Sequence, residues 1–195
     1  MGNKIILFFL SILMFSKLSH FILRMMGWSF KGSWPEGYKK LMVIVVPHTS
    51  NWDFPLGVLY RSYLNREVKF VGKASLFRFP VKGLLKAMGG IPVNRSKSSN
   101  FVDNVIKLYN DRETLFIQLA PEGTRKKVKK LKSGFYYIAQ GANIPILMIK
   151  FNYKDKEFEI GEPLMPSDFE KDMKQIDDFY RNTIGYNKEY SYLCD

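Results

Sequence analysis

Short continuous apolar runs alternate along the chain with segments in which apolar residues recur every three or four positions. The runs predict buried strands, and the more mixed EFEIGEPL segment predicts a more exposed one. The expected strands cover residues 41–46, 68–71, 115–119, 144–151 and 157–164. The expected helices cover residues 54–65, 84–88, 99–111, 134–140 and 171–182. Strands that alternate with helices predict an α/β domain with a mostly parallel central sheet flanked by helices.

The first 30 residues form the most apolar region of the chain. Their continuous apolar run, residues 5–15, is shorter than the roughly 20 residues of a spanning helix, and Lys17 and Arg24 interrupt its continuation. We expect a membrane-associating helix at 1–30 that lies in one leaflet, followed by a single domain at 31–195. A helix packed on the protein's own core and a single spanning helix stay open as alternatives. A secretory signal peptide is disfavoured because the run is not followed by a small-x-small cleavage site.

Composition and charge narrow the classes of partner. The 195 residues are 46% hydrophobic and 25% charged, which suits one globular domain. Lys and Arg number 30 against 18 Asp and Glu, and the net charge of +12 favours anionic partners. The run RKKVKKLK at 125–132 has no aromatic residue that could stack on a base. We therefore expect this run at an anionic membrane surface or an acidic carrier protein, and not on nucleic acid.

Cysteine and histidine are scarce. The single cysteine, Cys194, excludes a disulfide within the chain and a thiolate metal cluster, and it suits a reducing, cytosol-facing compartment. With two histidines and no HExxH arrangement, a zinc site is not expected. The sequence implies no metal and no organic cofactor.

One histidine, His48, stands just after the strand predicted at 41–46, and Asp53 comes five residues later. Side chains five apart in one helix point about 140° away from each other. The pair can therefore meet only if His48 lies in the loop before a helix and Asp53 in its first turn, with Ser50 or Asn51 as a candidate N-cap. Asp53 would then hold one imidazole nitrogen and make the other a better base. The alternative is a lone surface histidine that happens to precede an aspartate.

Three further blocks carry candidate chemistry. GGIPVNRS at 89–96 closes a helix and supplies Arg95. APEGTRKK at 120–127 follows a predicted strand; its glycine lets the backbone approach a ligand, and Arg125 offers a planar donor fork suited to phosphate. ANIPILMIK at 142–150 places a proline in an apolar strand. Each block alone is compatible with an ordinary turn or core strand.

In this order, the four blocks resemble the glycerolipid acyltransferase family, that of the lysophosphatidic acid acyltransferases. The family pattern is H-x4-D, G-x-x-[F/V]-x-R, P-E-G-T-R and a Pro-containing apolar strand; this chain has HTSNWD, GIPVNR, PEGTR and IPILMI. The resemblance covers residues 43–151 and the membrane-seeking N-terminus. It implies acyl transfer from a thioester of acyl carrier protein or coenzyme A to the free hydroxyl of a lysophospholipid. Lysophosphatidic acid is the default acceptor, and the expected location is the cytoplasmic face of the inner (cell) membrane.

The same resemblance implies roles for individual residues. His48 would be the general base and Asp53 would orient it, so that the acceptor hydroxyl attacks the thioester directly, without an acyl-enzyme. Arg95 would bind the acceptor phosphate. The other residues that the resemblance assigns to the acceptor site are Lys73, Glu122, Gly123, Thr124 and Arg125.

Two departures from the family pattern concern the acceptor. Ala120 stands where the family usually has Phe, and Lys126 where Ser is commoner. Another lysolipid, such as the lyso-form of an amino-acid-containing lipid, therefore stays open as the acceptor. A non-catalytic lipid-binding protein and a thioester hydrolase are rival functions. The histidine–aspartate pair argues against the first, and Arg95 with Arg125 argues against the second, since water needs no phosphate clamp.

Overall fold

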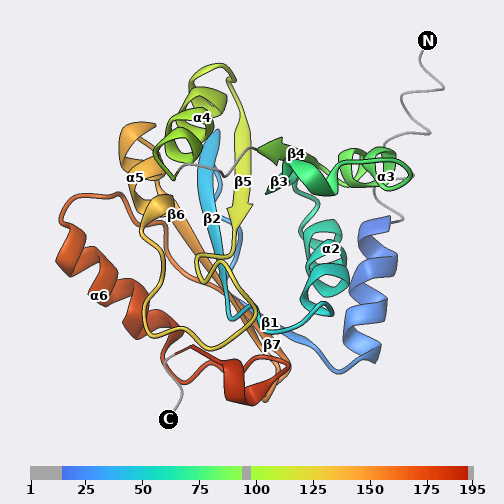
Figure 1. Ribbon diagram of the computed structural model, residues 1–195. Helices are drawn as coiled ribbons and strands as arrows, with labels where there is room; N and C mark the ends of the chain where they lie inside the picture. Colours follow the sequence, from blue (N-terminus) through green and yellow to red (C-terminus); the bar gives the residue numbers. More distant parts are fainter. Residues whose placement is uncertain (1–14, 94–97, 193–195) are drawn as a thin grey trace.

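A seven-stranded sheet forms the centre of the protein in the computed structural model, which describes residues 15–93 and 98–192 (Figure 1). The strands are β1 (Ser29–Lys31), β2 (Lys40–Val46), β3 (Val68–Lys73), β4 (Gly90–Val93), β5 (Leu115–Leu119), β6 (Ile146–Asn152) and β7 (Glu157–Ile160). Their order across the sheet is β1-β7-β6-β2-β5-β3-β4. Neighbouring strands run parallel except for β6 and β7. The predicted mostly parallel sheet is therefore confirmed.

Helices cover both faces of the sheet (Figure 1). They are a helix over residues 15–25, α2 (Asp53–Leu64), α3 (Lys82–Ala87), α4 (Ser98–Asn110), α5 (Gly134–Gly141) and α6 (Phe169–Tyr180). The helix 15–25 and α2 pack on one face, while α4, α5 and α6 pack on the other. Short 3-10 turns occupy Ala74–Leu76 and Lys188–Tyr190. The molecule is thus a helix–sheet–helix sandwich.

The central strand β2 shows why this chain folds in layers. Met42 and Ile44 point into the core under α4, α5 and α6, whereas Leu41 and Val43 point into the core under α2 and the helix 15–25. All four side chains are buried. Successive strand residues face opposite sides, so a strand covered on both faces requires a continuous apolar run.

The helix 15–25 packs on the domain through one side. Leu23 is fully buried, and the Ser16 hydroxyl donates a 3.0 Å hydrogen bond to the carbonyl of Tyr63 on α2. The boundary expected after residue 30 falls inside β1, which pairs with β7. Among the described residues, no helix combines the length and the apolar character that crossing a bilayer would take.

The expected strands and helices are present, with ends that differ by a few residues, but the hydrophobic pattern does not predict β1 or β4. β1 has only three residues, of which Ser29 and Lys31 are not apolar. β4 contains Gly90 and Pro92, which are poor strand formers. Both strands lie at the edges of the sheet, where such residues are tolerated.

The strands β2, β5 and β6 bring three loops together. Register pairs Ile44 with Leu119 and Val46 with Lys150, so the three carboxyl ends lie at one edge of the sheet. The HTSNWD block follows β2, the PEGTR block follows β5, and the loop after β6 stands beside them. The chain leaves β2 toward α2 on one face and β5 toward α5 on the other. Open α/β sheets bind ligands at such a switch.

Candidate active site

His48 and Asp53 meet at the carboxyl end of β2. Nδ1 of His48 lies 3.0 Å from Oδ2 of Asp53, and α2 begins at Asp53. The histidine therefore lies in the loop and the aspartate in the first helical turn, as their spacing requires. We assign the imidazole proton to Nδ1 because it faces a carboxylate, which leaves the lone pair on Nε2. The side chain of His48 is 25% exposed and lines an open cavity.

The Asp53 carboxylate accepts hydrogen bonds on both oxygens. Besides facing His48, Oδ2 accepts from the backbone N–H groups of Thr49 and Ser50, both at 2.8 Å. Oδ1 accepts from the hydroxyl of Tyr153, also at 2.8 Å. Hydrogen bonds to an ionised carboxylate are among the strongest in proteins. They fix the carboxylate in the orientation that faces the imidazole.

The start of α2 differs from the expected cap. The N-cap residue is Trp52, which makes no side-chain cap bond, so the expectation of Ser50 or Asn51 at that position is wrong. The Ser50 hydroxyl instead accepts from the N–H of Trp52 at 3.1 Å. The aspartate in the first turn bonds backward to the loop, which closes the turn without a side-chain cap.

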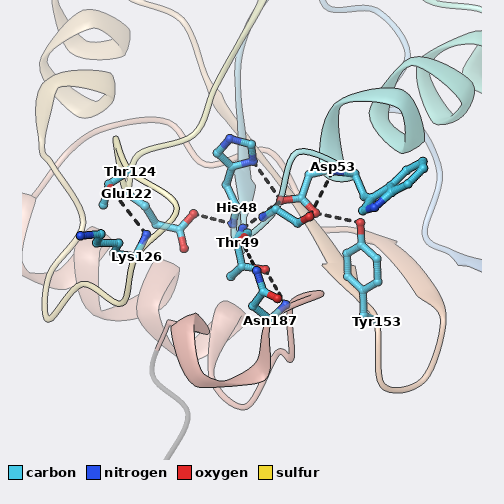
Figure 2. Close-up of polar contacts among 10 residues, drawn as sticks. His48, Thr49, Asp53, Glu122, Thr124, Lys126, Tyr153 and Asn187 are labelled. Carbon is cyan, nitrogen blue, oxygen red and sulfur yellow. Dashed lines mark hydrogen bonds and ion pairs between the residues drawn. The ribbon is translucent and has the colours of Figure 1, made fainter.

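Tyr153 follows β6 directly and approaches Asp53 from the opposite side to His48 (Figure 2). Its ring lies edge-on to Trp28 and to Tyr186, at centroid distances of 5.2 and 5.6 Å. Burial, together with the nearby Asp53 charge, raises the pKa of the Tyr153 phenol. The phenol therefore stays protonated at neutral pH and acts as a hydrogen-bond donor to the aspartate.

Glu122 supports the same loop from the β5 side (Figure 2). Its Oε2 accepts a 2.6 Å hydrogen bond from the backbone N–H of His48, and the side chain is buried. Burial raises the pKa of Glu122 to about 8, and the Asp53 charge adds to the shift, while the bond from His48 opposes it. At neutral pH the carboxyl group is therefore mainly neutral. Its other oxygen, Oε1, is buried without a hydrogen-bond partner in the described part of the chain.

The segment after α6 closes under the His48 loop (Figure 2). Asn187 donates from its side-chain amide to the Thr49 carbonyl at 2.7 Å and from its backbone N–H to the Thr49 hydroxyl at 3.1 Å. A Cβ atom on Gly185 would lie 2.6 Å from the same hydroxyl. Only glycine lets the two backbones approach so closely.

A cavity of about 1690 Å³ opens in front of His48, among α2, α4 and the loop after β5. Phe54, Val58, Phe101 and Val102 give it apolar walls. The volume exceeds the roughly 300–1,000 Å³ of pockets for drug-sized ligands. The cavity therefore has room for an elongated apolar group beside a polar one.

The structure brings only some of the acceptor-site residues implied by the sequence to the cavity. Gly123, Thr124 and Arg125 line the cavity, whereas Glu122 is buried beneath it against the His48 loop. Arg95 lies outside the described residues, and of Lys73 only the backbone in β3 is described. The roles assigned to these residues in acceptor binding stay predictions.

Two further cations, Lys126 and Lys132, line the cavity beside Arg125. Gly123 has a positive φ of 66°, and a Cβ atom there would lie 2.6 Å from Nζ of Lys132. The side chain of Lys132 therefore lies directly over the turn. This arrangement gathers positive charge on one wall, as an anionic ligand requires.

Sequence reasoning did not find Tyr153, Asn187 or Lys132 as parts of the site. Tyr153 had a weak signal, since it comes two residues after the strand predicted at 144–151. Asn187 had none, because nothing in the spacing brings it to Thr49. Within residues 15–93 and 98–192, no group of three His, Cys, Asp or Glu side chains could hold a metal ion.

Comparison with known proteins places the chain in a family and relates its fold to a solved structure. The model of the acyltransferase family matches residues 30–151. The chain is also similar to a crystal structure of the 1-acyl-sn-glycerophosphate (LPA) acyltransferase PlsC from Thermotoga maritima. The two share 22% sequence identity over 86% of this chain and 76% of that one, with a TM-score of 0.61, which supports a common fold. No curated protein matches the chain. Because the family match spans more than half of its length, the chain belongs to the acyltransferase family and is an enzyme that transfers acyl groups.

Proposed function

We propose that this enzyme transfers a fatty acyl group from an acyl thioester to the free hydroxyl of a lysophospholipid, with lysophosphatidic acid as the first candidate. The observation that carries the proposal is the pair of His48 and Asp53, 3.0 Å apart, beside a cavity that Arg125 also lines. The PlsC enzyme of similar fold is described as acting on LPA, which supports the same acceptor class here.

The proposed reaction is a direct displacement. Nε2 of His48 accepts the proton of the lysolipid hydroxyl as its oxygen attacks the thioester carbonyl carbon. Asp53 holds the resulting imidazolium through Nδ1. When the tetrahedral intermediate collapses, the carbon–sulfur bond breaks and the imidazolium gives its proton to the departing thiolate. The products are an ester and a free thiol, and the base is restored.

The charges on the cavity wall support an acceptor that carries phosphate. Arg125 offers a planar fork of donors, and Lys126 and Lys132 line the same cavity. Arg95 would complete this anion site, as the resemblance implies. These cations could also contact an anionic thioester donor, so acceptor-dependent thiol release is what separates the transferase from a hydrolase.

The net charge and the apolar N-terminal region support a proposal for the donor and for the location of the enzyme. Either acyl carrier protein or coenzyme A would present an anionic thioester to a protein whose net charge is +12. We propose that the enzyme works at the cytoplasmic face of the inner (cell) membrane, where an apolar acceptor resides and where the apolar N-terminal region would associate with lipid.

The test is thiol release from palmitoyl-coenzyme A and from palmitoyl-acyl carrier protein, with and without lysophosphatidic acid in detergent micelles. The expected result is acceptor-dependent release with a stoichiometric gain of phosphatidic acid by mass spectrometry. Equal release without acceptor would assign a hydrolase. If only another lysolipid supports release, the acceptor assignment is wrong and the transfer chemistry stands.

A further inference from the structure

Several exposed apolar side chains lie in the stretch of chain between β3 and β4. Phe79 is 95% exposed, Leu84 on α3 is 62% exposed, and Val81 between them is also exposed. This short stretch of chain thus presents several large apolar side chains to solvent. Large exposed apolar patches rimmed by polar residues are a mark of protein–protein or membrane interaction sites.

Basic residues lie beside these apolar side chains in the same stretch of chain. Arg78, Lys82 and Lys86 are exposed, and Lys82 and Lys86 are one helical turn apart. From Arg61 to Lys97 the only acidic residue is Glu67. We call the six residues Arg78, Phe79, Val81, Lys82, Leu84 and Lys86 the Phe79 patch. Apolar side chains with cations around them suit the surface of an anionic bilayer.

The helix 15–25 presents a second surface of the same character. Its side chains on the domain side include the buried Leu23, whereas large apolar side chains on the outer side are exposed. These outer residues are Phe15, Leu18, Phe21 and Met25. Their spacing of three or four residues places them along one side of the helix, and Lys17 and Arg24 are exposed beside them.

The last turn of α2 joins the two surfaces. On one side, the carbonyl of Tyr63 accepts the hydrogen bond from Ser16 of the helix 15–25. On the other, Nη1 of Arg61 donates to the carbonyl of Met88 at 2.6 Å, just after α3. Figure 1 shows the helix 15–25 and α3 on the side of the sheet that α2 covers. Both apolar surfaces are therefore anchored to one helix.

The Phe79 patch also adjoins the cavity. Leu85 lines the cavity from α3, while Leu84, its neighbour in sequence, is exposed. One short helix therefore has the cavity on one side and the apolar patch on the other.

We propose that the Phe79 patch and the outer side of the helix 15–25 form one docking face for an anionic lipid bilayer, with the acceptor lipid entering the cavity past α3. The proposed docking face rests only on the exposed side chains, their charges and the hydrogen bonds that hold both surfaces to α2. The entry route rests on the proposed function, because it needs a lipid acceptor.

Binding of the full-length protein to vesicles tests the docking face without reference to activity. The variant Phe79→Ser/Leu84→Ser should partition about tenfold less into vesicles of phosphatidylglycerol and phosphatidylcholine, measured over a range of lipid concentrations. Met165→Ser, which removes an apolar side chain that is also exposed, is the matched control and should bind as wild type. Equal binding of the double variant and the control would overturn the proposal. A loss of self-association with unchanged vesicle binding would assign the patch to a second copy and also overturn it.

If the N-terminal region dominates the affinity for vesicles, the depth of residue 79 in the bilayer gives a second test. In a Cys194→Ser background, an environment-sensitive fluorophore on Phe79→Cys should brighten with these vesicles and be quenched by a lipid-soluble quencher. The fluorescence of the same label on Met165→Cys should stay as it is in buffer. A label at Phe79→Cys that is indifferent to vesicles would contradict docking.

The entry route has its own readout. The variant Phe79→Ser/Leu84→Ser should lose about tenfold in transfer to lysolipid held in vesicles and keep wild-type transfer to lysolipid in detergent micelles. If the wild type transfers to neither, the proposed function fails, and vesicle binding still decides the docking face. If the variant loses both activities equally, the entry route is wrong.

Discussion

The hydroxyl of Tyr153 donates a 2.8 Å hydrogen bond to Oδ1 of Asp53, across 100 positions of sequence. The other oxygen of the same carboxylate faces the imidazole of His48. Asp53 thus lies between the imidazole of His48, which would carry the reacting proton, and the phenol of Tyr153, which takes no part in that proton transfer. We infer that Tyr153 is a positioning residue, which acts on the reaction through Asp53.

Replacing Tyr153→Phe should lower kcat by about tenfold or more and leave both KM values near wild type. A hydrogen bond to a charged group is worth about 1.5–3 kcal/mol, and here it holds the carboxylate that orients the base. Steady-state kinetics with each substrate varied in turn separates the two parameters. Tyr186→Phe keeps its ring beside Tyr153 and serves as the control with wild-type kinetics. A rise in KM alone would show that Tyr153 contributes to binding instead.

Replacing Glu122→Gln should preserve the fold, and Glu122→Ala should destabilise it by about 1–3 kcal/mol. Glutamine resembles the neutral acid and still accepts from the His48 N–H, whereas alanine leaves that part-buried donor unpaired. Chemical denaturation at neutral pH measures the difference. Equal stability of the two variants would contradict the role of Glu122 in holding the His48 loop.

The raised pKa of Glu122 has a consequence for stability. Between its ordinary value of 4.5 and about 8, the unfolded chain has released this proton and the folded chain retains it. The free energy of unfolding should therefore fall as pH rises, by up to about 1.4 kcal/mol per pH unit from this group. Denaturation curves at about pH 5 and about pH 8 should show a smaller fall for Glu122→Gln than for wild type. An identical fall would mean that Glu122 is ionised in the folded protein.

Replacing Gly185→Ala should destabilise the protein by about 1–3 kcal/mol and lower activity. The added methyl group would lie 2.6 Å from the Thr49 hydroxyl and 3.0 Å from Pro47, so the His48 loop must move. Gly83→Ala is the control, because a Cβ atom there meets nothing within 4 Å and alanine favours its helix. Thermal unfolding together with kcat measures both effects. Wild-type activity in Gly185→Ala would show that the C-terminal segment does not position the loop.

Replacing Arg125→Lys should raise KM for lysophosphatidic acid about tenfold and leave KM for the thioester unchanged. Lysine keeps the charge but loses the planar fork that matches phosphate. Lys174→Arg on α6, which is exposed and does not line the cavity, controls for general charge effects. A larger effect on the thioester KM would move Arg125 to the donor site.

The elements that sequence predicts well are those whose own residues specify them. Apolar runs long enough to bury two faces, such as β2 and β6, are recognisable in the sequence by themselves. Edge strands such as β1 and β4 depend on a neighbouring strand for their stability, so their own residues carry little signal. The five-residue spacing of His48 and Asp53 constrains their geometry because the contact is local.

The residues that hold the His48 loop in place cannot be predicted in this way, because their contacts are long-range. Glu122 reaches His48 across 74 positions, and Asn187 reaches Thr49 across 138. No periodicity connects residues so far apart, and only the sheet order brings their loops to one edge. The exposure of Phe79 and Leu84 is likewise a property of the folded surface. The sequence shows two apolar residues there without showing that nothing in the described fold covers them.

We propose His48 as the base for acyl transfer to a lysolipid. The most direct test compares wild type with His48→Ala in acceptor-dependent thiol release, with product lipid measured by mass and folding checked by circular dichroism. The folded variant should lose about 10²–10⁴-fold in rate, with thiol release and new ester falling together. A folded His48→Ala variant that forms the ester at the wild-type rate would contradict this proposal.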